Sequence, residues 1–339
     1  MSTTHPIYPE HDFDEEIEKS LRAANWMDNY FSNNPHITVM GVPSLKVDKL
    51  GIDRVFKIDD ILYSVEYKAD FRTKQTGNIF VEIVSTQETP GWMYTMCSQN
   101  LMYFTDDDNW QNNRIYITPV AEMKKNFTKW ASYRKVPAYN KGYVSYGRIV
   151  PFREYQKACE KVIKGIPQND KGFDLAPFAA HDHFITPSAV RSLFPMFDSV
   201  LKDAIGERGR IETPDRTGLA SPEIGIHRIY WLNKFRATVN YAVSPVIDDK
   251  VFVPTRITKD SCQQTWKGWV NGCLAQQVMV YLPDLHKIFW FSLPVIKKQL
   301  KEWKKAYPLH EMEQNEVRYS GYCIPLDVFQ QTVHKVLAV

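Results

Sequence analysis

Short runs of alternating apolar and polar residues recur in the first half of the chain. Two β-rich runs, 53–58 and 61–67, flank two consecutive aspartates, and a third run follows at 79–84. Such alternation is typical of half-buried strands, and turn-forming residues between two runs predict a hairpin. A helical pattern precedes them at 14–31, acidic at its start, where the helix dipole favours negative charge.

The pattern continues with alternating helices and strands. A loop with Gly91-Trp92 precedes a helix near 93–99, strands follow near 100–105 and 114–118, and a basic helix occupies 120–131. We therefore expect an α/β fold, with a mixed sheet flanked by helices.

The chain contains an internal repeat. Residues 51–68 (GIDRVFKIDDILYSVEYK) align without a gap with residues 225–242 (GIHRIYWLNKFRATVNYA). Further matches follow in the same order: Gly91-Trp92 with Gly268-Trp269, and LMYFTDD at 101–107 with VMVYLPD at 278–284. A repeat of this length predicts two tandem domains, 1–165 (copy one) and 166–339 (copy two), joined near a Gly- and Pro-containing linker.

Composition narrows the class of protein. The 339 residues are 44% hydrophobic, 13% aromatic and 24% charged, which is typical of a folded globular chain. The sequence shows no apolar run of about 18 residues, so no membrane partner is expected. A polar, acidic N-terminus and five scattered cysteines predict an intracellular, cytoplasmic protein. The net charge of +3 neither indicates nor excludes a nucleic-acid partner.

Three polar residues of copy one fall on neighbouring predicted strands. Asp53 starts one strand, Glu66 lies on the next, and Lys68, two residues later, points to the same face as Glu66. Such a set is costly to bury without a compensating ion, and carboxylate oxygens suit Mg²⁺ or Mn²⁺. Lys68 could then act on a metal-bound water and stabilise charge on a phosphate. The alternative is that the three residues form a solvated sheet face.

The repeat favours the functional interpretation. Copy two has His227, Asn240 and Ala242 at the three positions, although the flanking residues are retained. Glu82 is likewise replaced, by Pro254. The polar residues are therefore dispensable for the fold, so a functional role in copy one is the better explanation.

The string GID, twelve residues and then EYK resembles the PD-(D/E)xK nuclease superfamily. Its spacing is similar to that of the archaeal Holliday-junction resolvases, and TGNIFVEI with the Gly-Trp pair is similar to phage-encoded nuclease-like proteins. The resemblance covers about residues 50–130 and extends to copy two only through the scaffold. Ile52 stands where the family usually has proline.

This resemblance implies a restriction-endonuclease-like fold for both copies, with roles for individual residues. Asp53 and Glu66 would bind Mg²⁺, or Mn²⁺ in its place, the main-chain carbonyl of Tyr67 would be a further ligand, and Lys68 would be the catalytic lysine. Family members often add a glutamate from the first helix, for which Glu16 and Glu18 are the candidates and Glu15 a weaker one. Glu82 is an additional carboxylate that could also bind the metal.

The sequence thus predicts a metal-dependent DNA endonuclease that nicks one strand of duplex DNA through a single site in copy one. Copy two would add binding surface, in a monomer with pseudo-dimeric symmetry. The alternatives are an inactive DNA- or protein-binding module, a homodimeric nuclease specific for branched DNA, and an RNase of the same fold. The resemblance also suggests a phage or mobile-element origin.

A basic run in copy two has two interpretations. Five lysines surround Trp303, and they either contact phosphates or form the solvated face of an amphipathic helix: Lys297, Lys298, Lys301, Lys304 and Lys305.

Overall fold

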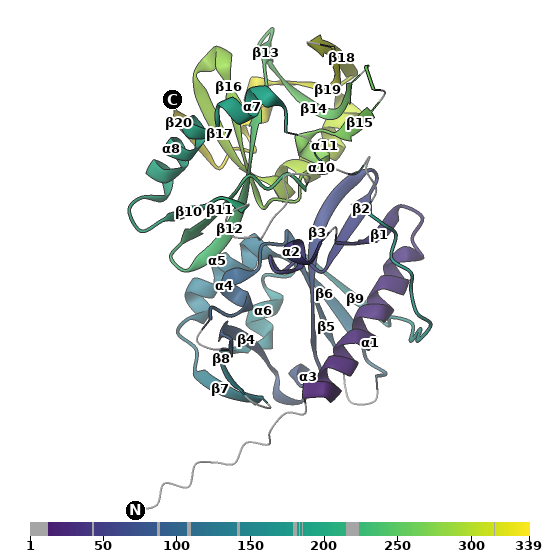
Figure 1. Ribbon diagram of the computed structural model, residues 1–339. Helices are drawn as coiled ribbons and strands as arrows, with labels where there is room; N and C mark the ends of the chain where they lie inside the picture. The colour runs from purple at the N-terminus through teal and green to yellow at the C-terminus, as the bar shows by residue number, and fades with distance from the viewer. Residues whose placement is uncertain are drawn as a thin grey trace, which may run out of the picture. The chain divides into compact units, whose positions relative to one another are not determined.

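The computed structural model describes residues 13–42, 44–86, 89–106, 110–140, 143–178, 182, 184, 186–214, 224–259, 261–262, 264–314 and 316–339. They form a mixed α/β protein with two similar six-stranded mixed sheets, each containing one parallel pair of strands (Figure 1). The α/β class predicted from the sequence is confirmed.

The elements of copy one are α1 (Phe13–Ser32), β1 (Ile37–Gly41), α2 (Leu45–Asp48), β2 (Arg54–Ile58), β3 (Ile61–Asp70), α3 (Thr73–Thr76), β4 (Asn78–Val84), α4 (Trp92–Thr95), β5 (Asn100–Thr105), β6 (Arg114–Pro119), α5 (Val120–Trp130), β7 (Lys135–Asn140), β8 (Tyr143–Pro151), α6 (Phe152–Gln156) and β9 (Lys161–Lys164).

Those of copy two are α7 (Ser188–Ser192), α8 (Phe194–Ile205), β10 (Arg210–Glu212), β11 (Arg228–Leu232), β12 (Phe235–Val243), β13 (Val246–Ile247), β14 (Lys250–Lys259), β15 (Gln264–Lys267), α10 (Trp269–Gly272), β16 (Gln277–Leu282), the 3₁₀ helix η4 (Pro283–Leu285), β17 (Lys287–Ser292), α11 (Leu293–Ala306), β18 (Leu309–Gln314), β19 (Val317–Pro325), α12 (Leu326–Gln330) and β20 (Lys335–Ala338).

The chain divides into two compact units that interleave along the sequence. Unit 1 comprises Met1–Asn34, Glu66–Met96 and Asn100–Asp174, and unit 2 comprises Pro35–Val65, Cys97–Gln99 and Leu175–Val339. These units are a different division from the sequence repeat. The boundary at 165/166 therefore stays a prediction.

The two six-stranded sheets have the same strand order. The first runs β1-β2-β3-β5-β6-β9 and the second β10-β11-β12-β16-β17-β20, with β12 and β16 parallel. The hairpins also share their register, since Arg54 pairs with Val65 and Arg228 pairs with Val239. The strand pairing thus follows the alignment of the sequence repeat.

Both hairpins turn through two residues in the left-handed region. Asp59 and Asp60 have φ of 49° and 68°, and Asn233 and Lys234 have φ of 49° and 76°. Positive φ at both central residues is the requirement of a type I′ turn, whose twist matches that of the flanking strands. The hairpin predicted between 53–58 and 61–67 is confirmed.

The third predicted strand of copy one lies outside the main sheet. β4 joins the three-stranded sheet β4-β8-β7, and its counterpart β14 joins the sheet β13-β14-β19-β18 with β15. Glu82 pairs with Gly147, and Pro254 pairs with Gly321, each beside an irregularity in the register. The expectation that 79–84 extends one mixed sheet was wrong, because the pairing partners of β4 come from residues much later in the chain.

Buried apolar residues form the core of each unit. In unit 2, the apolar side of α11, with Ile296, Leu300 and Trp303 all buried, faces a cluster that also contains Leu62 and Val278. In unit 1, α5 buries four apolar side chains: Val120, Met123, Phe127 and Trp130. None of the helices that the structure describes is long and apolar enough to span a membrane.

Candidate active site

Strand β3 carries the predicted Glu-Tyr-Lys element. Glu66 and Lys68 lie on one face of the strand and Tyr67 on the other, because side chains alternate along a strand. The Glu66 residue is only 4% exposed, whereas the Lys68 side chain is 32% exposed. The Lys68 ammonium donates a hydrogen bond to the Glu66 carboxylate. The pair thus combines a buried carboxylate with a cation that reaches solvent.

Glu82 of β4 belongs to the same cluster. Burial raises the pKa of its carboxyl, whereas the backbone N–H of Trp92, the charge of Lys68 and a hydrogen bond with Ser145 act in the opposite direction. The Trp92 nitrogen lies 3.3 Å from Oε2 of Glu82. In unit 1, the Lys68 ammonium therefore contacts the Glu66 carboxylate and lies within electrostatic range of Glu82.

Glycine is required at position 91 by sterics. A Cβ on Gly91 would lie 2.7 Å from the backbone carbonyl carbon and oxygen of Glu82. Real Cβ atoms do not approach backbone atoms this closely, so glycine lets the start of α4 approach β4. The Trp92 N–H is thereby positioned to donate to the Glu82 carboxylate.

Asp53 immediately precedes β2 and belongs to unit 2. Its backbone N–H donates to the carbonyl oxygen of Val65 over 2.9 Å. In copy two, His227 makes the same bond to Val239 over 3.0 Å. The two residues therefore occupy equivalent places in their hairpins, as the alignment predicted. The role of Asp53 as a metal ligand stays a prediction.

The first-helix glutamates lie on α1. Glu16 lies 3.8 Å from the Lys19 ammonium, and the charge of Glu18 acts on Arg22. Asp28 of the same helix accepts a 2.9 Å hydrogen bond from the Tyr67 hydroxyl, on the face of β3 opposite Glu66. The contacts of α1 thus do not bring Glu16 or Glu18 to Glu66, and a first-helix ligand stays a prediction.

Sequence reasoning missed a further carboxylate on the face of Glu66. Asp70 ends β3 two residues after Lys68, and it accepts hydrogen bonds from the Thr73 N–H at 2.9 Å and the Tyr103 hydroxyl at 2.6 Å. These contacts give Asp70 a role in ordering the start of α3. The alternation in Glu66–Asp70 (EYKAD) is the signal that could have identified it.

The donor chemistry at this site suits Mg²⁺ in part. Among the described residues, no group of three or more His, Cys, Asp and Glu side chains is arranged to hold a metal ion. Mg²⁺ commonly takes only one or two protein carboxylates and completes its shell with water and substrate phosphate. Glu66 and Glu82 provide two such carboxylates in unit 1, and the Tyr67 carbonyl as a ligand stays a prediction.

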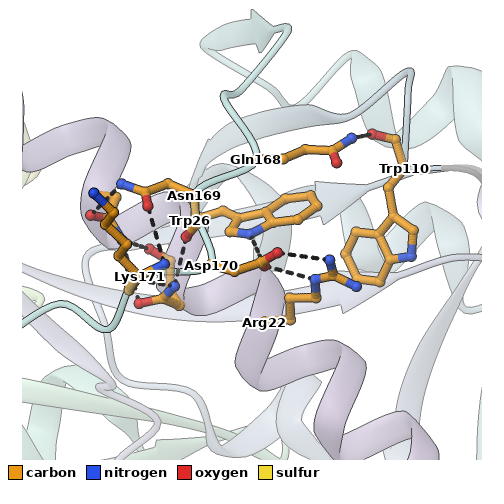
Figure 2. Close-up of polar contacts among 9 residues, drawn as sticks. Arg22, Trp26, Trp110, Gln168, Asn169, Asp170 and Lys171 are labelled. Carbon is orange, nitrogen blue, oxygen red and sulfur yellow. Dashed lines mark hydrogen bonds and ion pairs between the residues drawn. The ribbon is translucent and has the colours of Figure 1, made fainter.

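In unit 1, a second polar cluster joins α1 to Asp170, in the predicted linker, through hydrogen bonds (Figure 2). Arg22 donates two hydrogen bonds of 2.9 Å to Asp170, and the Trp26 indole donates a third to the same carboxylate. Figure 2 shows the Arg22 guanidinium beside the rings of Trp26 and Trp110, and its central carbon lies 5.1 and 5.0 Å from their centroids. These contacts lower the pKa of Asp170, chiefly through Arg22. The cluster is an anchor for the chain after Gly165.

No known family model, curated protein or solved structure matches this chain. The resemblance to PD-(D/E)xK nucleases therefore rests on the sequence motif alone and stays a prediction.

Copy two keeps the strands of the candidate site without its charges. Asn240 is fully buried and donates its amide to the Gly225 carbonyl at 2.9 Å. Ala242 is buried, and Pro254 takes the ladder position of Glu82. Copy two thus forms the same hairpin, and it pairs β14 with β19 as copy one pairs β4 with β8, with an amide, a methyl group and a proline at the three positions.

Proposed function

We propose that this protein is a divalent-metal-dependent nuclease of the PD-(D/E)xK type that hydrolyses phosphodiester bonds of DNA at one site in copy one. The observation that carries the proposal is the contact of the Lys68 ammonium with the buried Glu66 carboxylate, with Glu82 in its electrostatic range. The matching strands of copy two have none of these three side chains.

Energetics support a functional origin for this cluster. Burying charged groups costs several kcal/mol per ion in effective terms, and apolar or neutral replacements are often neutral or stabilising. Copy two forms the same hairpin register with Asn240 and Ala242 in place of Glu66 and Lys68. A charged cluster that the fold does without is better explained by chemistry than by stability.

The side chains have complementary roles in this proposal. Glu66 and Glu82 would hold Mg²⁺, with Asp53 and the Tyr67 carbonyl as the further ligands that the resemblance implies. When bound, such an ion lowers the pKa of a coordinated water and neutralises charge on the phosphate. Glu66 orients the Lys68 ammonium, and Lys68 would stabilise the charge that develops on the scissile phosphate.

A single site predicts a single cut. Copy two has no carboxylate or lysine at the equivalent positions, so one chain would cleave one strand of duplex DNA per encounter. Two chains that associate would bring two intact sites together and would cut both strands. The product therefore distinguishes the nickase from the dimeric, junction-specific alternative.

A binding module is the second candidate. The observation that favours it is that no three metal-ligating side chains converge among the described residues. Such a module would bind DNA equally well with Mg²⁺ and with EDTA, and it would leave every substrate intact.

The test is incubation of supercoiled plasmid with the wild type, Glu66→Gln and Lys68→Met, in Mg²⁺, Mn²⁺ or EDTA. Lys125→Met is the matched control, because Lys125 is a largely exposed lysine of α5 outside the cluster. We expect metal-dependent open circles with the wild type and the control, and a loss of roughly 10²-fold or more in both site variants. Linear product would instead show paired sites. The nuclease proposal fails if plasmid, branched DNA and RNA all remain uncut.

A further inference from the structure

Copy two has a pocket beside the residue that replaces Asp53. It lies within unit 2, has a volume of about 190 Å³, and is lined by His227 and by residues from α7, α8 and the segment after β10. The lining residues that matter here are Thr186, Arg191, Phe194, Thr213, His227 and Arg228. None of the described residues that line the pocket is acidic.

The hydrogen bonds of His227 show which of its two ring nitrogens carries the proton. The backbone N–H of Tyr241 donates to Nδ1 of His227 at 2.8 Å, so Nδ1 is an acceptor. Burial lowers the pKa of His227 to about 3, so the ring is neutral and its single proton is on Nε2. Nε2 lies 2.6 Å from the Thr186 hydroxyl oxygen and donates to it.

This arrangement leaves the Thr186 hydroxyl proton available as a donor. Thr186 is 5% exposed, its oxygen accepts from His227, and its side chain lines the pocket. The structure shows no acceptor for the hydroxyl proton among the described residues. A buried donor of this kind costs about 1–3 kcal/mol when it stays unsatisfied, which favours an acceptor in the pocket.

The charged residues that line the pocket also favour an anion. Arg228 uses three of its five N–H donors, two on the Asp198 carboxylate and one on the His227 carbonyl, and these bonds hold its guanidinium in place. Arg191 is exposed, and its positive charge acts on His227. Its guanidinium has no hydrogen-bond or ion-pair partner in the part of the chain that the structure describes. A planar donor fork on a pocket whose described lining residues include no acid is suited to an anion.

We propose that this pocket binds a phosphoryl group without a metal ion, through the Arg191 guanidinium and the Thr186 hydroxyl. Both ends of the imidazole are engaged, so His227 has no lone pair for a metal. The volume is below the roughly 300–1,000 Å³ of typical organic ligand sites, which suits one phosphoryl group. The group belongs either to free phosphate or a nucleotide, or to the end of a DNA strand.

Calorimetric titration of the full-length protein in EDTA tests this inference. The probes are inorganic phosphate, thymidine 5′-monophosphate, and a short DNA duplex with and without 5′-phosphates. We expect Arg191→Gln to weaken phosphate binding by at least about tenfold. Arg208→Gln, an exposed arginine outside the pocket, is the matched control and should change the affinity by less than about twofold.

The Thr186 hydroxyl has its own pair of variants. Thr186→Val removes the donor and should weaken binding, and Thr186→Ser keeps it and should restore binding, which a purely structural role would not require. Duplex binding that depends on both a 5′-phosphate and Arg191 would identify a strand end as the ligand. Binding of phosphate and nucleotide alone would identify a small molecule.

Three results would overturn the proposal: no phosphate binding up to about 10 mM, binding that needs Mg²⁺, or equal affinities for Arg191→Gln and Arg208→Gln. The titration measures binding and not cleavage. Its failure is therefore distinguishable from failure of the proposed nuclease activity.

Discussion

The Lys297 ammonium lies 2.6 Å from the carbonyl oxygen of Cys273, at the end of the short helix α10. Lys124 of α5 lies 2.7 Å from the carbonyl oxygen of Met96, at the end of α4. In both copies, a lysine of the helix that follows the hairpin strands, α5 or α11, thus donates a hydrogen bond to the turn after the Gly-Trp pair. Lys297 is fully buried and also donates to the Leu62 carbonyl.

Replacement of Lys297 should destabilise the protein. Lys297→Met removes the donor to the Cys273 and Leu62 carbonyls, and buried acceptors without a donor cost about 1–3 kcal/mol in the free energy of unfolding. Lys298→Met, at the next, exposed position of α11, should leave the free energy of unfolding within about 0.5 kcal/mol. Urea unfolding at pH 7 measures both.

The pH dependence of the same variant gives a second readout. Burial lowers the pKa of Lys297 to about 7 from its ordinary value of 10.5. Between these values the unfolded chain binds a proton that the folded chain does not. Stability from this group therefore rises with pH, by at most about 1.4 kcal/mol per unit. Lys297→Met should lose this rise, and an unchanged slope between pH 7 and 9 would contradict the buried position.

The contrast between Lys297 and its neighbours shows what the sequence could predict. The repeat, helix α1 and both hairpins follow from local patterns, and the structure contains them. The basic run looks uniform in the sequence, so the burial of Lys297 was not predictable. Its burial depends on Leu62 and Gln99, which come from the first half of the chain.

The same limit applies to the candidate site. Glu66 and Lys68 are two residues apart on one strand, so their contact follows from strand periodicity alone. The contact of Glu82 with the Trp92 N–H depends on the close approach of Gly91, which is visible only in three dimensions. Edge strand β1 was missed because its run of five residues is too short to show a period.

The neutral state of His227 should make stability fall on acidification. Its pKa is about 3 in the folded protein, against an ordinary value of 6.5. Between these values only the unfolded chain binds the proton, so stability present above pH 6.5 is lost as the pH falls. At pH 5 the loss from this group is about 2 kcal/mol.

Comparison with a variant isolates the His227 contribution from the other titrating groups. In His227→Gln, the free energy of unfolding should decrease by about 2 kcal/mol less than in the wild type between pH 7 and pH 5. Urea unfolding at the two pH values provides the measurement. Parallel losses in the two proteins would show that His227 accepts a proton in the folded state.

The glycines of the two Gly-Trp pairs should be intolerant of alanine. A Cβ on Gly268 would lie 2.0 Å from the Pro254 carbonyl oxygen, and one on Gly91 would lie 2.7 Å from that of Glu82. Overpacking against backbone costs about 1–3 kcal/mol or more. Both substitutions should lower the unfolding midpoint, Gly268→Ala more than Gly91→Ala. Gly172→Ala, with open space around the new methyl group, should leave it unchanged.

Glu82→Gln should separate stability from the proposed activity. Burial raises the pKa of Glu82 from its ordinary value of 4.5, so the folded chain holds a proton where the unfolded chain has released it. Stability from this group is therefore highest at low pH and falls as the pH rises through the folded pKa. Glutamine keeps an acceptor for the Trp92 N–H and removes the buried charge. The variant should consequently be more stable than the wild type at pH 7.

This advantage should disappear below pH 4.5, where Glu82 is protonated in both folded and unfolded wild type. Thermal unfolding at pH 7 and pH 4 measures it, with Glu122→Gln on the exposed surface of α5 as the control.

In the plasmid assay, Glu82→Gln should cut more slowly than the wild type although it is the more stable protein. If Glu82→Gln is instead less stable than the wild type at pH 7 and not at pH 4, the charged Glu82 carboxylate stabilises the fold. Such a result would contradict the view that the charges of the proposed site serve chemistry at the expense of stability.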